Sequence, residues 1–149
     1  MAKDCLILPR PGADLKVPGE LAETAVTRGR SDSGSLSYFQ CCKALAEYRQ
    51  GHREGAISWA RKAAASSSPY PRGEAYAILA MAQHQLKQTD DSRAALKVCA
   101  DVVQREMPKL DDGLLGGDWR DWIVAHALLT EAKSQIEGPT LPVGTPGAK

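Results

Sequence analysis

The sequence predicts an all-α protein, and two observations lead to this prediction. The chain of 149 residues contains a single Phe and three Trp, whereas alanine is abundant. Alanine has the highest helix propensity, and its short side chain allows helices to pack closely. The second observation is an internal repeat, because the stretch ALAEYRQGHREGAISWARKAA at residues 44–64 recurs in a looser form, AMAQHQLKQTDDSRAALKVCA, at residues 80–100. This constant offset of 36 residues is typical of a helical repeat protein.

The N-terminal residues predict two short helical segments. Residues 2–8, AKDCLIL, are followed by PRPG and have the pattern of the last turns of a helix, so we interpret residues 1–12 as the remnant of a preceding helix and its turn. Residues 18–29 predict a short helix with Pro18 in its first turn, where no amide donor is needed. The residues expected on its apolar face are Leu21, Ala22, Ala25 and Val26.

The first copy of the repeat predicts a pair of helices. Apolar residues at helical spacing predict a helix over residues 36–50, and Gly51 supplies the turn. The partner helix begins within residues 52–67, HREGAISWARKAAASS. Prolines within residues 66–73, SSSPYPRG, are expected to keep this pair separate from the next helix.

The second copy predicts a second pair. Its first helix is expected over residues 72–87. Thr89 is expected to cap the second helix, with Asp90 and Asp91 favourably placed against the N-terminal helix dipole. Apolar residues then continue at helical spacing until Pro108 approaches.

A last helix is predicted over residues 118–137, with Asp118 as its cap. Its apolar surface is wide enough for a terminal helix that lies across the end of a stack. The apolar residues form two sets on neighbouring turns, with Trp119, Ile123, Ala127 and Leu128 in one and Trp122, Ala125 and Leu129 in the other. Residues 138–149 have too few apolar residues to pack, and we predict a disordered tail there.

The repeat is similar to the tetratricopeptide repeat (TPR), in which a helix, a turn and a second helix occupy about 34 residues. The second copy matches the signature of that repeat at Tyr76, Leu79, Ala80, Ser92 and Leu96. The first copy matches at Ala44, Tyr48, Gly51, Ala56 and Ala63, and it departs at Gln40, Lys43 and Arg53. These departures concern the packing of the first pair of helices. Small residues at Ala44, Ala56, Ala80 and Ser92 are expected where helices cross closely.

Three runs, at residues 38–63, 75–96 and 117–132, resemble a particular bacterial TPR family, and the resemblance extends over residues 2–137. Segments of that family occur near the C-terminal end of large proteins that carry a serine/threonine kinase domain or WD repeats. The resemblance implies a right-handed helical solenoid of antiparallel helix pairs over residues 13–137, with repeats at about 37–70 and 73–107 and a capping helix at 118–137. The chain has no glycine-rich kinase loop, HRD or DFG, so any catalysis in a parent protein is expected elsewhere.

Charge and hydropathy argue against several classes of partner. The 19 basic and 18 acidic residues give a net charge of +1, so attraction to nucleic acid or to an anionic membrane is not expected. No apolar run approaches the roughly 18 to 20 residues that cross a bilayer, and we predict a cytoplasmic chain. Without a CxxC pair, the cysteines are expected to be small buried residues in a reducing compartment, at Cys5, Cys41, Cys42 and Cys99.

No catalytic site, metal site or cofactor is predicted. His52, His84 and His126 are too far apart for a zinc-ligand spacing; His84 is expected to face the groove and His126 to be half-buried and hydrogen-bonded. Cys41 and Cys42 lie on an apolar helix face rather than beside a base. The run GDWRDW is explained by a helix cap and a charge pair, and LLGGDW lacks the lysine and hydroxyl of a phosphate-binding loop.

By analogy with the family, the first helix of each repeat lines a concave groove that holds a peptide. The residues expected there are Tyr38, Cys41, Leu45, Tyr48 and Arg49 in the first repeat and Glu74, Ala77, Met81, His84 and Gln85 in the second. Such a mixed lining suits peptide recognition, with Arg49 receiving a backbone carbonyl or a carboxylate. The sequence thus predicts a non-catalytic protein–protein interaction module that binds a peptide or docks another domain of its own chain.

Two other functions stay open at this point. The alternative is a structural or regulatory appendage of a larger bacterial serine/threonine kinase or WD-repeat protein, with no ligand of its own. It is suggested by residues 2–8, which leave an apolar helix end without a visible partner. An enzyme is the third reading, and it requires a polar cleft that the periodicity does not indicate. Self-association through the N-terminal edge of the repeats is a further expectation.

Overall fold

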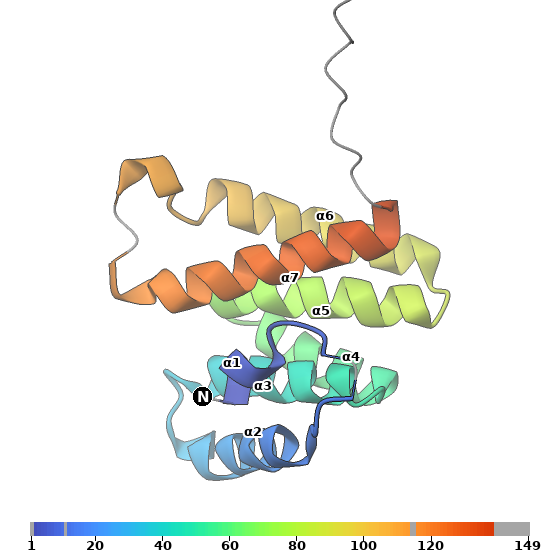
Figure 1. Cartoon of the computed structure of the whole chain (residues 1–149). Helices are drawn as coiled ribbons and strands as arrows, with labels where there is room; N and C mark the ends of the chain where they lie inside the picture. Colours follow the sequence, from blue (N-terminus) through green and yellow to red (C-terminus); the bar gives the residue numbers. More distant parts are fainter. Residues whose placement is uncertain (1, 11, 114–115, 139–149) are drawn as a thin grey trace, which may run out of the picture.

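The computed structural model describes residues 2–10, 12–113 and 116–138, and these residues are all-helical, as the sequence predicts (Figure 1). They form α-helices and short 3-10 turns, with no strand among them. The α-helices are α1 (Ala2–Leu6), α2 (Lys16–Arg28), α3 (Leu36–Arg49), α4 (Arg53–Ala64), α5 (Pro69–Gln85), α6 (Thr89–Arg105) and α7 (Trp119–Glu137). The 3-10 turns are Gly29–Ser31, Leu110–Asp112 and Gly116–Asp118. Apart from Gly138, the predicted tail lies outside the described residues.

The two predicted N-terminal helices both form. α1 ends at Leu6, which is buried in the core. α2 begins two residues before Pro18 and packs on α1 and α3 with Pro18, Ala22 and Val26, which recur every four residues along one side. Leu21 is 48 % exposed, so its prediction as a packing residue is wrong. The reason is geometric, because neighbouring residues point about 100° apart around a helix.

The internal repeat is present in the structure as well as in the sequence. α3 and α5 end 36 residues apart, and α4 and α6 begin with the same offset. Gly51 and Lys87 hold equivalent positions in the two turns, and both have positive φ, +84° and +64°. In both turns the next residue donates its amide N–H to a carbonyl five residues back at 2.9 Å, His52 to Glu47 and Gln88 to Gln83.

Substitutions at these two positive-φ positions are expected to change stability in opposite directions. Lys87→Gly relieves a left-handed conformation that costs an ordinary residue roughly 1–2 kcal/mol, and after the added freedom of the unfolded chain a net stabilisation of about 0.5–1 kcal/mol should remain. Gly51→Lys should destabilise by about 1 kcal/mol, although its Cβ meets no other atom within 4 Å. Urea denaturation measures both changes, and a loss of stability in Lys87→Gly would contradict the argument.

The starts of α5 and α6 differ from those predicted, and that of α7 lacks the predicted capping hydrogen bond. α5 begins at Pro69, about three residues early, because the first turn of a helix needs no amide donors and so accommodates both Pro69 and Pro71. The prolines therefore begin the helix instead of preceding it. Thr89 is the first residue of α6 rather than its cap, a position that Gln88 holds without a side-chain hydrogen bond. Asp118 does precede α7, but its side chain makes no capping hydrogen bond either.

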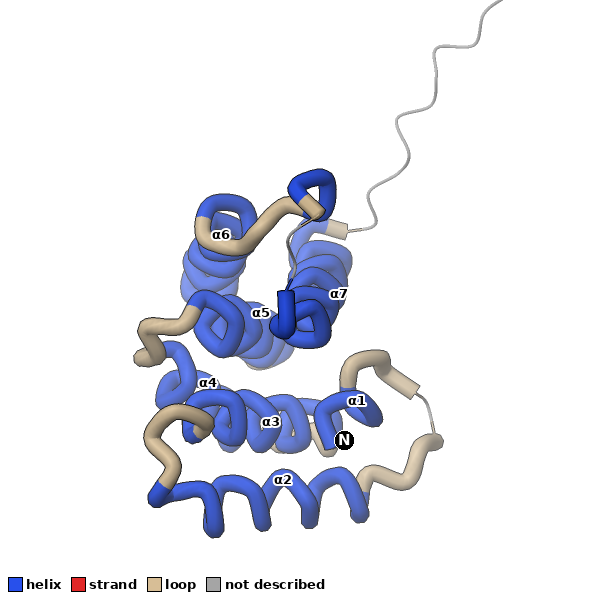
Figure 2. Tube along the Cα trace, turned by 90° about the vertical axis from the view of Figure 1, so that its left-hand side faces the viewer, coloured by secondary structure: helices blue, strands red, loops and turns tan. Residues whose placement is uncertain are grey.

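α3 and α5 lie at the centre of the molecule. α5 packs against α3, α4, α6 and α7, and α3 packs against α1, α2 and α4. Figures 1 and 2 show α1 over α3 and α7 over α5 on the same side of this centre. In Figure 2, α4 and α6 lie on the other side. The first helices of both copies thus share one side that α1 and α7 cover.

Small residues allow the helices to cross closely, as predicted. Ala44, Ala56, Ala80 and Ser92 are all 0 % exposed. The Ser92 hydroxyl on α6 donates to the carbonyl of Ala80 on α5 at 2.8 Å, so a side chain of one helix reaches the backbone of the other. A crossing of this kind leaves no room for a longer side chain at either position.

Contacts with α2 account for Lys43, which stands where the TPR signature has a large apolar residue. Its ammonium pairs with Glu23 of α2 at 2.9 Å and with Glu47 one turn further along α3. The lysine side chain is only 12 % exposed. A polar residue at this apolar repeat position therefore joins α3 to the helix that precedes it.

One of the two apolar sets on α7 is covered, whereas in the other set only Leu128 is fully buried. Ala125 and Leu129 are buried, and Trp122 donates its indole N–H to the carbonyl of Pro108 at 2.7 Å. Trp119 and Ile123 are nearly half exposed, because α7 turns its other side toward α5 and α6. Among the described residues, no helix combines the length and the apolar character needed to cross a membrane.

Candidate binding face

The ten residues predicted to line a groove lie on α3 and α5, and we call the side of these helices that α1 and α7 cover the inner face. Gln85 is exposed, whereas Tyr38, Arg49 and His84 are partly buried. The others are buried: Cys41, Leu45, Tyr48, Glu74, Ala77 and Met81. The inner face is therefore not an open groove, because two segments of the same chain occupy it.

An ion-pair network holds α1 on the inner face. Lys3 donates to both carboxylate oxygens of Glu74 on α5, at 3.1 and 3.0 Å, and to Asp121 on α7 at 2.7 Å. Glu74 is 1 % exposed, and the Lys3 ammonium also lies 5.5 Å from the ring centroid of Tyr38 on α3. Leu6, buried on the same short helix, adds an apolar contact. Lys3 thus ties α1 to three other helices.

Arg49 binds the C-terminal end of α1 and joins it to α7. Its Nε donates to the carbonyl of Leu6 at 2.8 Å, and its Nη2 donates to the carbonyl of Ile7 at 2.7 Å. The two terminal nitrogens also donate to the two carboxylate oxygens of Glu131, at 2.6 and 2.7 Å, in a bidentate pair. The predicted partners of Arg49 were a backbone carbonyl or a carboxylate, and in the structure it binds both within its own chain.

Burial beside one shared ammonium changes the acid–base properties of this network. The pKa of Glu74 is raised to about 7, and burial is the largest cause. The nearby ammonium of Lys3 acts in the opposite direction and lowers this pKa, whereas the charge of Asp121 raises it. Burial alone would lower the pKa of Lys3, but Glu74 and Asp121 raise it well above its usual value. Burial also raises the pKa of Cys41, whose thiol donates to the carbonyl of Pro71 at 3.0 Å. A thiol kept protonated in this way is a poor nucleophile.

The contribution of Glu74 to stability is expected to fall as pH rises. Between its ordinary pKa of 4.5 and about 7, the folded protein keeps a proton on Glu74 that the unfolded chain releases. The stabilisation is therefore complete below pH 4.5 and is lost as pH rises through 7. The groups that face Glu74 are Lys3 on α1, Asp121 on α7 and Cys41 on α3, and the pKa values of Lys3 and Cys41 are raised far above this window.

Comparison with Glu74→Gln isolates this effect. From about pH 5 to pH 8, the free energy of unfolding of the parent should fall by about 1–3 kcal/mol more than that of the variant. Urea denaturation at the two pH values provides the measurement, and the titration of groups common to both chains cancels in the difference. Equal changes in the two proteins would mean that Glu74 titrates alike in the folded and unfolded states.

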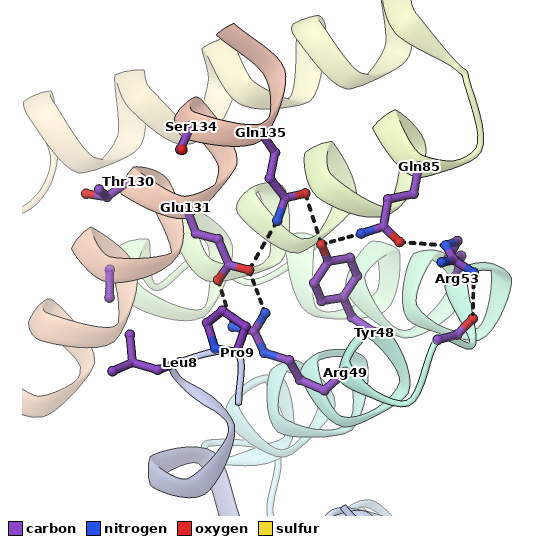
Figure 3. A pocket seen from close by; sticks show the side chains of 12 residues that line it. Leu8, Pro9, Tyr48, Arg49, Arg53, Gln85, Thr130, Glu131, Ser134 and Gln135 are labelled. Carbon is purple, nitrogen blue, oxygen red and sulfur yellow. Dashed lines mark hydrogen bonds and ion pairs between the residues drawn. The ribbon is translucent and has the colours of Figure 1, made fainter. Parts of the chain in front are cut away.

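A pocket of about 560 Å³ lies beside this network, between the ends of α3 and α5, the side of α7 and the segment after α1 (Figure 3). The Tyr48 hydroxyl donates to Gln135 at 3.1 Å and accepts from the Gln85 amide at 2.8 Å. The Gln85 carbonyl oxygen accepts from Arg53 at 2.5 Å. The pocket lining consists of Leu8, Pro9, Tyr48, Arg49, Gly51, Arg53, Gln85, Ala127, Thr130, Glu131, Ser134 and Gln135. It presents a row of hydrogen-bonding groups beside a few apolar side chains.

Several residues that build this site were not among those predicted: Lys3, Arg53, Asp121, Glu131 and Gln135. They come from α1, α4 and α7, which the repeat pattern does not place on the inner face. On α7 a signal exists, because Glu131 and Gln135 are polar residues one turn apart on a helix with a wide apolar surface. On α1 there is none, because five residues are too few to show a period.

The other candidates have structural explanations. His126 donates from Nδ1 to the carbonyl of Trp122 at 2.8 Å and stacks on its ring, as expected of a half-buried histidine. The cysteines that are buried as predicted are Cys41, Cys42 and Cys99. Cys5 is exposed, contrary to the prediction, because α1 faces the core with Leu6 instead. Within the described ranges, no group of three or more His, Cys, Asp or Glu residues is arranged to hold a metal ion.

The inner face therefore combines the buried carboxylate of Glu74, the partly buried carboxylate of Asp121, the partly buried Arg49 and an adjoining polar pocket. Compared with protein-family models, with curated proteins and with solved structures, the chain has no match in any of the three.

Proposed function

We propose that this protein is a non-catalytic interaction module whose inner face binds a short segment of another protein or of an attached domain. The observation that supports this most is the seating of α1 on that face. Arg49 donates hydrogen bonds to the carbonyls at the end of α1, and Glu74 and Asp121 bind the ammonium of its lysine. Leu6 of the same helix is buried. Main-chain hydrogen bonds combined with selective side-chain contacts are the usual means by which a protein recognises a peptide.

The proposal includes a finer architecture, a TPR-like solenoid of two helix pairs in which α7 is the capping helix. It is supported by the matching turns 36 residues apart, by the packing of each helix from α3 to α7 on the next, and by the small residues at the crossings. In such a solenoid the first helices of the pairs share one extended face. α3 and α5 are those first helices; α1 packs against α3 on this side and reaches α5 through Lys3.

Peptide selection on the immobilised full chain, from a random display library, tests this function. Arg53→Ala combined with Gln85→Ala removes two exposed polar side chains of the pocket that do not hold α1. The dissociation constant of the selected peptides should rise by at least about tenfold, because hydrogen bonds to the bound segment are lost. Fluorescence anisotropy with labelled peptides measures this change.

Arg61→Ala combined with Gln88→Ala is the matched control. It removes the same two residue types from a separate surface of α4 and the turn before α6. The affinity of the selected peptides should stay within about twofold of the parent value. A library that yields no binder, or binders that both double variants hold equally well, would contradict the proposal.

The second candidate function, an appendage of a larger bacterial serine/threonine kinase or WD-repeat protein, is favoured by a different observation. Leu8, Val17 and Leu21 are 63, 57 and 48 % exposed and line a second pocket between α2 and the segment after α1. Apolar residues gathered in this way are expected at an edge that packs against another part of a protein. An absence of peptide binders would favour this function over the first. The cytoplasmic location stays a prediction under both.

A further inference from the structure

α1 contacts the rest of the protein mainly through side-chain hydrogen bonds and one buried side chain, as a bound peptide does. Leu6 is the only residue of α1 that is buried, and the other strong contacts of the helix are polar. A helix of five residues is far below the roughly 12–15 residues that an isolated helix needs in water, so its helical form depends on the inner face. The remaining helices bury an extensive core of their own, to which α1 adds the buried side chain of Leu6 and the partly buried Ala2.

The contacts read three features of α1 at a fixed spacing. Glu74 and Asp121 bind the ammonium of Lys3, and Leu6, one turn later, is buried. Arg49 then donates to the carbonyls of Leu6 and Ile7. Carbonyls at the C-terminal end of a helix have no amide N–H of the same helix to accept from, so Arg49 supplies the missing donor. The inner face thus selects a basic residue, an apolar residue three positions later and a helix end directly after it.

We propose that α1 is an exchangeable occupant of the inner face, and that the partner displacing it is a segment of another protein in which a basic residue precedes a leucine by three positions at the end of a helix. This inference rests on the proposed function and specifies the chemistry of its partner. Charge complementarity supports it, because two carboxylates face a single ammonium in the present arrangement. A partner arginine, with its five N–H donors, can bind both carboxylates at once.

The tether decides how strongly α1 competes. Residues 7–15 join α1 to α2 without a helix among the described positions, and a short tether of this kind gives an effective concentration on the order of mM. A partner binds only to the fraction of molecules in which α1 is undocked, so its apparent affinity is reduced by that fraction. Weakening α1 should therefore increase the affinity for a partner without any change in the inner face.

Binding of the chain's own segment as a free peptide tests this inference. The probe is a peptide of residues 2–10 with Cys5→Ser and a C-terminal fluorescein, and anisotropy reports its binding to the full chain. A full chain with Lys3→Ala retains Arg49, Glu74 and Asp121 and should bind this probe at least about tenfold more tightly than the parent. A probe with its own Lys3→Ala should bind at least about tenfold more weakly to the same chain.

Two further variants separate the effect from misfolding and from net charge. Leu6→Ala in the full chain weakens α1 without changing a charge and should also increase the affinity for the probe. Lys97→Ala removes an exposed lysine from α6 and should bind the probe as the parent does. Circular dichroism and urea denaturation establish that each variant is folded in the assay. A fluorophore on Cys5, which is exposed on α1, reports undocking of α1 in the parent chain.

The outcomes distinguish the two proposals. Tighter binding by both α1 variants, with loss of binding by the lysine-free probe, supports the exchange of α1. Folded variants that bind the probe no better than the parent overturn it. If library-selected peptides bind in the pocket while the Cys5 fluorophore does not respond, the proposed function stands and this inference fails. A dimer of the parent that Leu6→Ala abolishes would assign the occupant to a second copy of the chain and overturn its assignment to another protein.

Discussion

Replacing Arg49 with methionine is expected to lower the free energy of unfolding by about 3 kcal/mol, because it leaves one half of a buried ion pair without its partner. The Arg49 side chain is 6 % exposed and that of Glu131 is 15 % exposed. The substitution also removes the two donors to the carbonyls of Leu6 and Ile7, so the end of α1 loses its hydrogen bonds. Urea denaturation monitored by circular dichroism measures the change.

Two comparisons show whether this cost comes from the unpaired carboxylate. Arg53→Met, on an exposed arginine four residues later, should change stability by no more than about 0.5 kcal/mol. Arg49→Met combined with Glu131→Met should recover a large part of the loss, because apolar side chains of similar size can replace a buried pair with little net cost. A double variant as unstable as Arg49→Met alone would place the cost in the lost contacts with α1 instead.

Ala80→Leu is expected to destabilise the protein by about 2–3 kcal/mol, because it overpacks the crossing of α5 and α6. Ala80 is fully buried, and its carbonyl accepts a hydrogen bond from Ser92 of the other helix at 2.8 Å. A longer side chain at this position has to separate the two helices or adopt a strained rotamer. Thermal and urea denaturation both report the loss.

The matched control for this substitution is Ala94→Leu, on the exposed side of α6. Alanine and leucine are both good helix formers, so this change should stay within about 0.5 kcal/mol of the parent. If Ala80→Leu were as stable as Ala94→Leu, the crossing would have room that the structure does not show, and the register of the repeat would need revision.

The elements from α3 to α6 were predictable because they depend on signals that are local in the sequence. Apolar spacing indicated each helix, and Gly51 indicated the first turn by its tolerance of positive φ. Lys87 adopts the same conformation without being glycine, so only the repeat offset could have revealed that turn. The start of α5 was misplaced because Pro69 and Pro71 were interpreted as a break, whereas the first helical turn accepts proline.

The candidate site was predictable only in part. The resemblance to the TPR family implied that α3 and α5 line the binding face and that Arg49 binds carbonyl or carboxylate oxygens, and in the structure Arg49 has both kinds of partner. Those partners could not be identified, because Lys3 is 71 residues from Glu74 and Arg49 is 82 residues from Glu131. No periodic signal connects residues at such separations.

By itself, the sequence determined the all-helical class, the repeat offset of 36 residues and the small residues at the helix crossings. Each of these follows from propensity, periodicity or side-chain size, which are properties of short stretches of chain. Only the tertiary structure decided that α1 and α7 cover the inner face, that Glu74 is buried beside Lys3, and that Trp119 remains exposed. The physical reason is that burial and ion pairing depend on which distant segments meet, and a helical pattern specifies an apolar face without specifying what covers it.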